Sequence, residues 1–273
     1  AYPDFANASP SIVEFETILK DSLFKEIDEF VKVSPEATDI FMLIKREAQE
    51  GEAVELMKWH LGILTDAQVI TPLKKLGKQD VVKMLKRIGY EAEVDEATRL
   101  FAKHQIPALL ESVFLRGRLL KLSAMVKGMK DAGEPLLGYI KQKVDMYNVV
   151  TVLRGLKNNI DAKAIEEVLI PNEGSFRKAE LREALKAGTQ AKALAYFESK
   201  GAPKAESPRE LEREYEKRIA SSLESMYYKG YGEFGAILGY LELKFNEISN
   251  IIRVANAVER GVDLKSLSQS YLT

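Results

Sequence analysis

Two polar residues stand out because of their spacing on a predicted helix. Asp145 and Asn148 are three residues apart, and each follows an apolar residue, Val144 or Tyr147. Residues at this spacing share one helix face. A carboxylate and an amide there can join neighbouring helices, because half-buried polar groups need hydrogen-bonding partners. Alternatively, they form a rim that contacts a partner protein. For Asp145 and Asn148 the internal interpretation is preferred.

Related polar residues recur about 100 positions later. Glu247 and Asn250 have the same spacing, and Arg253 follows them, as Arg154 follows Asn148. At the equivalent place, the first third of the chain has Gln49, Glu52 and Lys58 instead of this pair. For the longer Arg154 and Arg253, contact with a partner is preferred. Including two tyrosines, the candidates for partner binding or contacts between repeats are Tyr139, Asp145, Asn148, Arg154, Tyr240, Glu247, Asn250 and Arg253.

The sequence lacks the motifs of common enzyme sites. It has no cysteine, which excludes disulfides, thiolate metal sites and cysteine nucleophiles. It also lacks the Gly-x-x-x-x-Gly-Lys-Ser/Thr phosphate loop, His-Glu-x-x-His and Asp-Asp-x-x-Asp, and no Gly-x-Gly-x-x-Gly follows a strand. We therefore predict no catalytic residue, no metal site and no cofactor. His60, His104 and Trp59 are expected to be surface or packing residues, and Glu166 and Glu167 to be solvated.

Composition narrows the class of protein further. The chain has 273 residues, 40 Lys and Arg, 41 Asp and Glu, and a net charge of −1. This balance lacks the basic excess of nucleic-acid-binding proteins. Apolar residues make up 46% of the chain, enough for a sizeable core. No apolar run reaches the roughly 18 residues of a membrane-spanning helix, and no signal peptide is visible.

The chain contains a three-fold internal repeat. A Pro-x-x-x-Glu pattern begins at Pro10, Pro107 and Pro208, with spacings of 97 and 101 residues. Proline suits the first position of a helix, and Ser207 to Glu210 has the form of a capping box. Residues that can close a helix in the left-handed conformation follow each pattern, at Gly62, Asn159 and Gly261. Aspartates that can cap the next helix come soon after, at Asp66, Asp161 and Asp263.

Each repeat therefore predicts two long helices followed by shorter ones. Apolar residues at spacings of three and four mark the second helix, and Gly117 in a first helix permits close approach of a neighbour. No alternating strand pattern is present. We predict one all-α domain over residues 1–273, built from three related helix-pair units, 1–72, 73–174 and 175–273, with pseudo-three-fold symmetry. The first unit is expected to lack an N-terminal segment.

Several of these segments resemble a known family. Residues 138–148, followed by Leu153-Arg154, are similar to the "Tyr, Asp-x-x-Asn, Leu-Arg" helix of rotary ATPase connector subunits. These connectors are the C subunit of archaeal-type ATP synthase and the d subunit of the vacuolar ATPase. Residues 240–253 resemble the same helix, and Leu169-Ile170-Pro171 with Gly174 resembles a loop of the family. The resemblance covers nearly the whole chain, although unit one lacks the Asp-x-x-Asn pair.

The resemblance implies a non-catalytic central-stalk subunit of a proton- or sodium-translocating A/V-type ATP synthase or ATPase. Such a subunit is a funnel with pseudo-three-fold symmetry, peripheral to the cytoplasmic face of the membrane. It sits on the proteolipid ring, which is its one contact with the membrane, and receives the foot of the central axle. The alternative is a cytosolic all-α helical-repeat adaptor that binds partner helices. A metal-dependent all-α enzyme is disfavoured by the missing ligand clusters.

Overall fold

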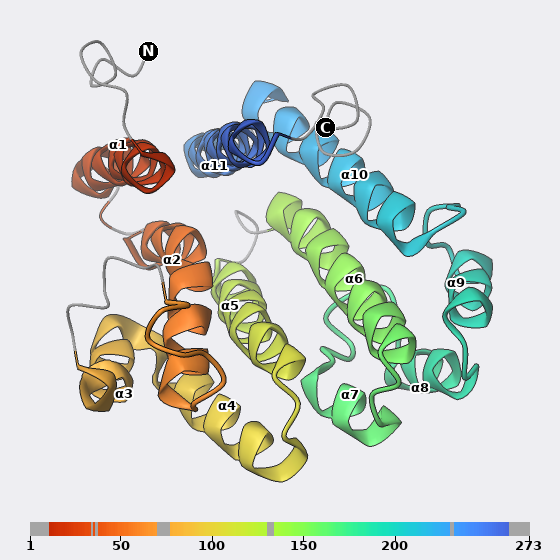
Figure 1. The fold of residues 1–273 in the computed structure, drawn as a ribbon. Helices are drawn as coiled ribbons and strands as arrows, with labels where there is room; N and C mark the ends of the chain where they lie inside the picture. The colour runs from red at the N-terminus through yellow and green to blue at the C-terminus, as the bar shows by residue number, and fades with distance from the viewer. Residues whose placement is uncertain are drawn as a thin grey trace. The chain divides into compact units, whose positions relative to one another are not determined.

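The computed structural model describes residues 11–33, 35, 38–69, 77–129, 134–229 and 232–261 (Figure 1). All regular elements in these ranges are helical, and none of the residues in them lies in a strand. The predicted all-α class is confirmed. The pseudo-three-fold symmetry stays a prediction.

Long helices occur in consecutive pairs, and shorter helices separate the pairs. The long helices are α1 (Ile12–Val33), α2 (Thr38–His60), α5 (Ala108–Gly128), α6 (Glu134–Lys157), α10 (Pro208–Lys229) and α11 (Gly232–Glu259). The shorter elements are η4 (Lys78–Asp80), α3 (Val81–Leu85), η5 (Lys86–Tyr90), α4 (Glu91–His104), α7 (Ala162–Val168), α8 (Lys178–Lys186) and α9 (Gln190–Ser199). This order is the one that the repeat predicts.

The prolines of the repeat mark helix starts where the structure describes them. Pro208 is the first residue of α10, and Pro107 immediately precedes α5, whereas Pro10 lies outside the described residues. The Ser207 hydroxyl accepts a hydrogen bond from the Glu210 backbone N–H at 3.2 Å. The Glu210 carboxylate accepts from the backbone N–H of Glu206 at 2.8 Å. Half of the predicted capping box is therefore present, because a different donor occupies the carboxylate.

The predicted helix-closing residues adopt the left-handed conformation. Gly62 has a φ of 77°, Asn159 of 53° and Gly261 of 66°. The backbone N–H groups of Gly62 and Asn159 each bond a carbonyl of the helix just ended, at 3.0 and 3.2 Å. Local chemistry thus ends these helices where the sequence indicates.

The aspartates that follow have different roles. Asp161 caps α7, because its carboxylate accepts from the backbone N–H of Lys163 at 2.9 Å. The prediction for Asp66 was wrong: its carboxylate accepts from the indole N–H of buried Trp59 at 2.6 Å and caps no helix. Asp263 lies outside the described residues.

The chain divides into two compact units. Unit 1 comprises Ala1–Ala48, Met129–Tyr139 and Glu216–Thr273, and unit 2 comprises Gln49–Gly128 and Ile140–Tyr215. The divisions fall inside α2, α6 and α10, so each of these helices contributes residues to both units. They do not coincide with the limits predicted for the three repeats, which stay a prediction.

Unit 1 contains α1 and α11, the first parts of α2 and α6, and the last part of α10. Its core is formed where α1 packs on α11, through Leu19, Leu23, Ile27, Leu238, Leu241 and Ile248. Gly239 lets α11 approach α10, because a Cβ there would lie 3.0 Å from the carbonyl oxygen of Leu223.

Unit 2 holds two apolar clusters. The first joins α2, α3, α4 and the start of α5, and the second joins α6 to α7, α8, α9 and the start of α10. Gly117 on α5 permits the close approach that the sequence indicates. A Cβ there would lie 2.5–2.8 Å from atoms of the Glu93 side chain on α4. Glu93 is buried, and its carboxylate is paired with Lys121 at 2.5 Å.

Candidate functional site

The candidate site of the described residues is assembled from a hollow and from polar side chains. It contains no group of three or more His, Asp or Glu side chains suited to hold a metal ion. None of its helices combines the length and the apolar character that crossing a bilayer requires. The features that could bind a partner are a hollow in unit 2 and the predicted polar residues around it.

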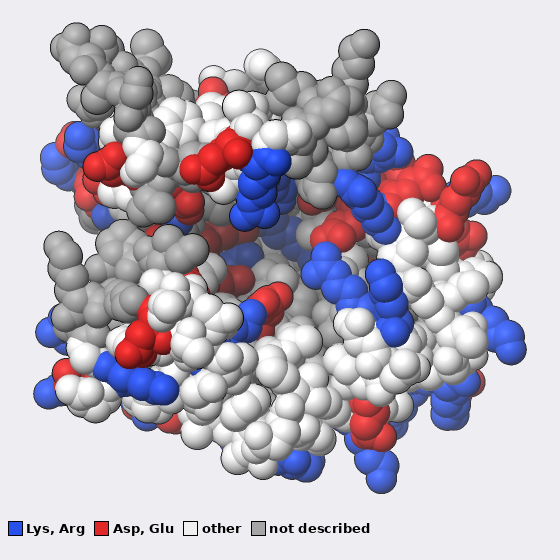
Figure 2. Space-filling view, in the orientation of Figure 1, with Lys and Arg blue, Asp and Glu red and all other residues white. Residues whose placement is uncertain are grey.

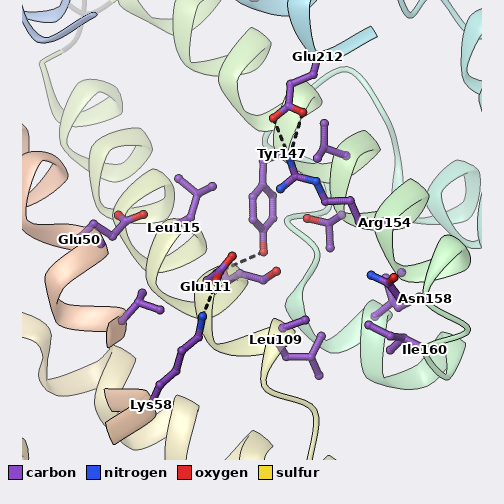
Figure 3. Close-up of a pocket in the computed structure, with 18 of the residues that line it drawn as sticks. Glu50, Lys58, Leu109, Glu111, Leu115, Tyr147, Arg154, Asn158, Ile160 and Glu212 are labelled. Atoms are coloured by element: carbon purple, nitrogen blue, oxygen red, sulfur yellow. Dashed lines mark hydrogen bonds and ion pairs between the residues drawn. The ribbon is translucent and has the colours of Figure 1, made fainter. Parts of the chain in front are cut away.

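A groove of about 670 Å³ lies in unit 2, between the second half of α2, the start of α5 and the second half of α6 (Figure 3). Its apolar lining includes Val54, Leu64, Leu109, Leu115, Met146, Val150, Ile160 and Ile165. Its charged lining consists of Glu50, Glu55, Lys58, Glu111, Arg154 and Glu212. An apolar floor with a charged rim is typical of a site for another protein segment.

Two ion pairs bridge helices at the rim of this groove. Lys58 on α2 lies 2.5 Å from Glu111 on α5. Arg154 on α6 donates to both carboxylate oxygens of Glu212 on α10, each at 3.0 Å (Figure 3). The Glu111 and Arg154 side chains are both 61% exposed. Exposed pairs of this kind contribute only about 0–1 kcal/mol, so a bound partner can replace them at little cost.

Behind the rim, more buried contacts hold the helices. Arg118 on α5 donates to Glu50 on α2 at 2.9 Å, and both side chains are mostly buried. The Tyr147 hydroxyl, which lies between α5 and α6 in Figure 3, donates to the carbonyl of Val168 at 2.5 Å and lies 3.0 Å from that of Ser112. Burial raises the pKa of Tyr147 above its usual value, so the phenol stays protonated as a donor.

Asn148 is hydrogen-bonded to the loop that follows α7. Its side-chain amide donates to the carbonyl of Ile170, and its oxygen accepts from the backbone N–H of the same residue, both at 2.8 Å. Asn148 and Ile170 are both buried, with exposed fractions of 0% and 1%. One side chain therefore satisfies both backbone groups of a residue 22 positions away.

Asp145 is hydrogen-bonded to the same loop at Ser175, five residues after Ile170. Its carboxylate accepts from the backbone N–H of Ser175 at 2.7 Å. A side chain at Gly174 would clash with that carboxylate, so the close approach needs glycine. Burial raises the pKa of Asp145, an effect that the hydrogen bonds from Ser175 and Phe176 and the charge of Lys141 oppose.

Glu173 ties this loop to α5. Its carboxylate accepts from the hydroxyl of Ser123 and lies 2.6 Å from the ammonium of Lys127. Burial acts to raise the pKa of Glu173, but the hydrogen bonds from Lys127 and Ser123 outweigh it, and the net shift is downward. No sequence pattern identifies Glu173, because its partners lie 46 and 50 residues earlier.

The structure thus brings three of the predicted residues together in unit 2. Asp145 and Asn148 make hydrogen bonds within the unit, and their assignment to an internal role stays a prediction. Arg154 lies at the groove, where it is exposed and pairs with Glu212. Its contact with a partner stays a prediction.

The other predicted residues lie in unit 1. Tyr139 is buried in it. Tyr240 donates its hydroxyl to Glu26 at 2.7 Å, which together with burial raises its pKa to about 12. Glu247 and Asn250 line a hollow of about 430 Å³ with Phe15, and Arg253 is exposed nearby on the same helix. Within the described ranges Asn250 has no hydrogen bond of the kind that Asn148 makes, so the two pairs are not equivalent in structure.

Glu166 and Glu167 are partly exposed, with side-chain exposed fractions of 31% and 25%, and both also form ion pairs. Glu167 lies 2.6 Å from Lys103, 3.1 Å from His104 and 3.2 Å from Arg99. The hydrogen bond from Lys103 is the main reason that the pKa of Glu167 falls to about 2. Glu166 pairs with Arg182. Each carboxylate is therefore partly solvated and also links α7 to another helix, which its sequence spacing does not indicate.

Charge of both signs is interspersed on the molecular face shown in Figure 2, where blue and red side chains lie among uncharged ones. This agrees with the near-zero net charge of the sequence. Specificity for a partner must then come from local features such as the groove rather than from a field of one sign.

Comparison with known proteins gives two matches. The family model described as "ATP synthase (C/AC39) subunit" matches residues 1–268. The C subunit of the A-type ATP synthase of Thermococcus kodakarensis is 27% identical over 177 residues, which are 60% of this chain and 48% of that protein. The alignment spans about half the length of that curated relative. No solved structure matches the chain.

Proposed function

This chain belongs to the ATP synthase (C/AC39) subunit family, and we propose that it is a non-catalytic connector in the central stalk of an A/V-type rotary ATP synthase or ATPase. In this role it joins the proteolipid ring of the membrane sector to the central axle. Rotation driven by ion flow is thereby coupled to ATP synthesis or hydrolysis. The observation that carries the proposal is the family match over residues 1–268.

Ion pairs that join segments distant in sequence support a mechanical rather than a chemical role. Several charged contacts of unit 2 join segments distant in sequence: Glu167 on α7 pairs with α4, Glu50 on α2 with α5, and Glu173 in the loop after α7 with α5. Cross-links of this kind stiffen a helical body against twisting. A connector that transmits torque needs such stiffness and many distributed contacts.

We place the foot of the axle in the unit 2 groove. The groove is concave, its floor is apolar, and its walls are long helices held by buried contacts. An amphipathic helix end fits such a surface by inserting apolar side chains at helical spacing. The chain then lies peripherally at the cytoplasmic face of the membrane, which it contacts through the ring.

Reconstitution tests this proposal. The purified chain should elute with the axle subunit and with the detergent-solubilised proteolipid ring of the same complex in size-exclusion chromatography. Leu115→Asp, which places a charge on the groove floor, should weaken axle binding while the circular dichroism spectrum is retained. Val258→Asp, at an exposed position on α11, is the matched control and should bind normally.

The contrary outcomes are equally defined. Failure of the folded chain to bind either the axle or the ring would overturn the proposal. Recovery of unrelated proteins instead of ATP synthase subunits with a tagged chain would favour the helical-repeat adaptor.

A further inference from the structure

We infer that the hollow on α11 in unit 1 binds a segment of this same chain, residues 263–273, which lie outside the described residues. In this arrangement a short helix and the loop after it cover α11, as α7 and its loop cover α6. The inference concerns an internal binding surface and is independent of the proposed function.

From Asp145 onward, α6 and the residues after it correspond to α11 and its following segment at a constant offset of 102 residues. Asp145 and Asn148 correspond to Glu247 and Asn250. The correspondence continues beyond the helices, where four residues have identical or chemically similar counterparts: Asp161 and Asp263, Lys163 and Lys265, Ile165 and Leu267, and Ile170 and Leu272. Both segments therefore have an aspartate that can cap a helix, followed by apolar residues four and nine positions later.

In unit 2 this face of α6 is buried by the segment that follows the helix. Three of its apolar residues have exposed fractions of 0% and belong to one cluster with Ile165 of α7: Val149, Val152 and Leu153. Asn148, on the same face, bonds both backbone groups of Ile170, each at 2.8 Å. The following segment thus supplies both the apolar cover and the partners of the amide.

The same face of α11 forms a hollow of about 430 Å³ in unit 1. Its apolar lining includes Ile251, Val254 and Ala255, the counterparts of the three buried residues of α6. All three are only partly buried. Asn250 also lines the hollow, and within the described ranges it makes no hydrogen bond of the kind that Asn148 makes. The hollow therefore offers apolar surface and an amide to a segment of the type that covers α6.

The turn after α11 directs the next residues towards this hollow. Gly261 has a φ of 66°, close to the 53° of Asn159 at the matching turn after α6. In unit 2 the chain returns from that turn so that Ile170, eleven residues further on, is hydrogen-bonded to α6. Leu272 stands eleven residues after Gly261, in position to bond Asn250. Spacing thus assigns the hollow to the next segment of this chain rather than to another molecule.

Disulfide trapping in the full chain, which has no cysteine of its own, tests the inference. In unit 2 a side chain at Gly155 would clash with Ile165, so these two positions touch, and their counterparts are Ala257 and Leu267. The double variant Ala257→Cys with Leu267→Cys should form an intramolecular disulfide when oxidised glutathione is added. Ala257→Cys with Gln269→Cys is the matched control and should react at least about tenfold more slowly, because positions two apart do not share a helix face.

Hydrogen exchange followed by NMR gives a second readout that needs no cysteine. The backbone N–H of Leu272 should be protected in the wild type, because Asn250 accepts from it, and Asn250→Ala should raise its exchange rate at least about tenfold. Asn256→Ala is the matched control, because Asn256 lies on α11 outside the lining of the hollow. It should leave the exchange rate of Leu272 unchanged.

Each outcome decides for or against the inference. A selective intramolecular disulfide, together with protection of Leu272 that Asn250→Ala removes, supports it. Equal reaction rates for the two cysteine pairs, or rapid exchange of Leu272 in the wild type, would show a segment without a fixed seat on α11 and would overturn it. Disulfides between two chains, seen as a species of twice the mass, would assign the hollow to a second copy and would also overturn it.

Discussion

Replacing Asn148 by alanine removes one side chain and leaves two backbone groups without partners. The N–H and the carbonyl of Ile170 both bond to Asn148 at 2.8 Å, and Ile170 is 1% exposed. A buried polar group that loses its partner costs about 1–3 kcal/mol. Two such groups give an expected loss of roughly 2–6 kcal/mol, a large share of the roughly 5–15 kcal/mol typical of a whole domain.

Urea unfolding followed by circular dichroism measures this loss. The midpoint should fall without a change in slope, and the melting temperature should fall by roughly 5–15 °C. Asn158→Ala is the matched control, because Asn158 is exposed just beyond the end of α6. Its effect should stay within about 0.5 kcal/mol, as for other surface substitutions.

A loss for Asn148→Ala as small as that of the control would refute the reasoning. The double variant Asp145→Ala with Asn148→Ala sharpens the test, since both residues hold one loop. Once Ile170 loses its bonds to Asn148, the loop is less ordered, so the hydrogen bond from Ser175 to Asp145 contributes less to stability. The sum of the stability losses of the two single variants should therefore exceed the stability loss of the double variant. An unchanged melting temperature would instead favour contact of the pair with a partner.

Other predictions concern pH, chemistry and symmetry. The pKa of Glu167 is lowered from 4.5 to about 2, so its contribution to stability is present above about pH 4.5 and is lost as the pH falls towards 2; the difference in urea midpoint between wild type and Glu167→Gln should close over that range. The pKa of Asp145 is raised above 3.8, so its contribution is present below that value and is lost as the pH rises through the folded-state pKa; Asp145→Asn should therefore gain on the wild type as the pH rises from about 3.5 to about 7. The isolated chain should hydrolyse no ATP, and chelators should leave its melting temperature unchanged; steady turnover would contradict this. In a crystal structure, superposing residues 107–175 on 208–273 should align Tyr139 with Tyr240, and a mismatch of helix or face would refute the repeat.

Sequence predicted those features of the fold that depend on neighbours along the chain. Gly62, Asn159 and Gly261 end helices because their backbones adopt the left-handed conformation readily, which is a property of one residue. Asp161 caps α7 by reaching two residues ahead. Asp66 has the same local pattern, but residues 66–68 form a turn rather than a helix, and its carboxylate accepts from the indole of Trp59. Tertiary contacts decided that position, and they are not visible in local spacing.

The candidate site shows the same division. The spacing of Asp145 and Asn148 identified a polar helix face, since helical periodicity is local. Their partners, Ile170 and Ser175, lie 22 and 30 residues away in a loop whose path the sequence does not indicate. The groove could not be predicted for the same reason, because its lining comes mainly from α2, α5 and α6, which are distant in sequence, and includes Glu212 on α10. Only Arg154, selected for its length and its place after the pair, pointed to it.

Helix α6 links the groove to the loop after α7, because one face of the helix lines the groove and another is hydrogen-bonded to the loop. Met146, Val150 and Arg154 are four residues apart, so they form one stripe, and all three line the groove. Asp145 and Asn148 lie on the neighbouring face and hold the loop after α7. Tyr147 lies between them, lining the groove while its hydroxyl bonds the carbonyl of Val168 at the end of α7. A force that a guest applies to the groove stripe must therefore act on a helix whose other face is fixed by buried hydrogen bonds. Under the proposed function, this arrangement resists rotation of α6 and passes torque from the axle into the body of unit 2.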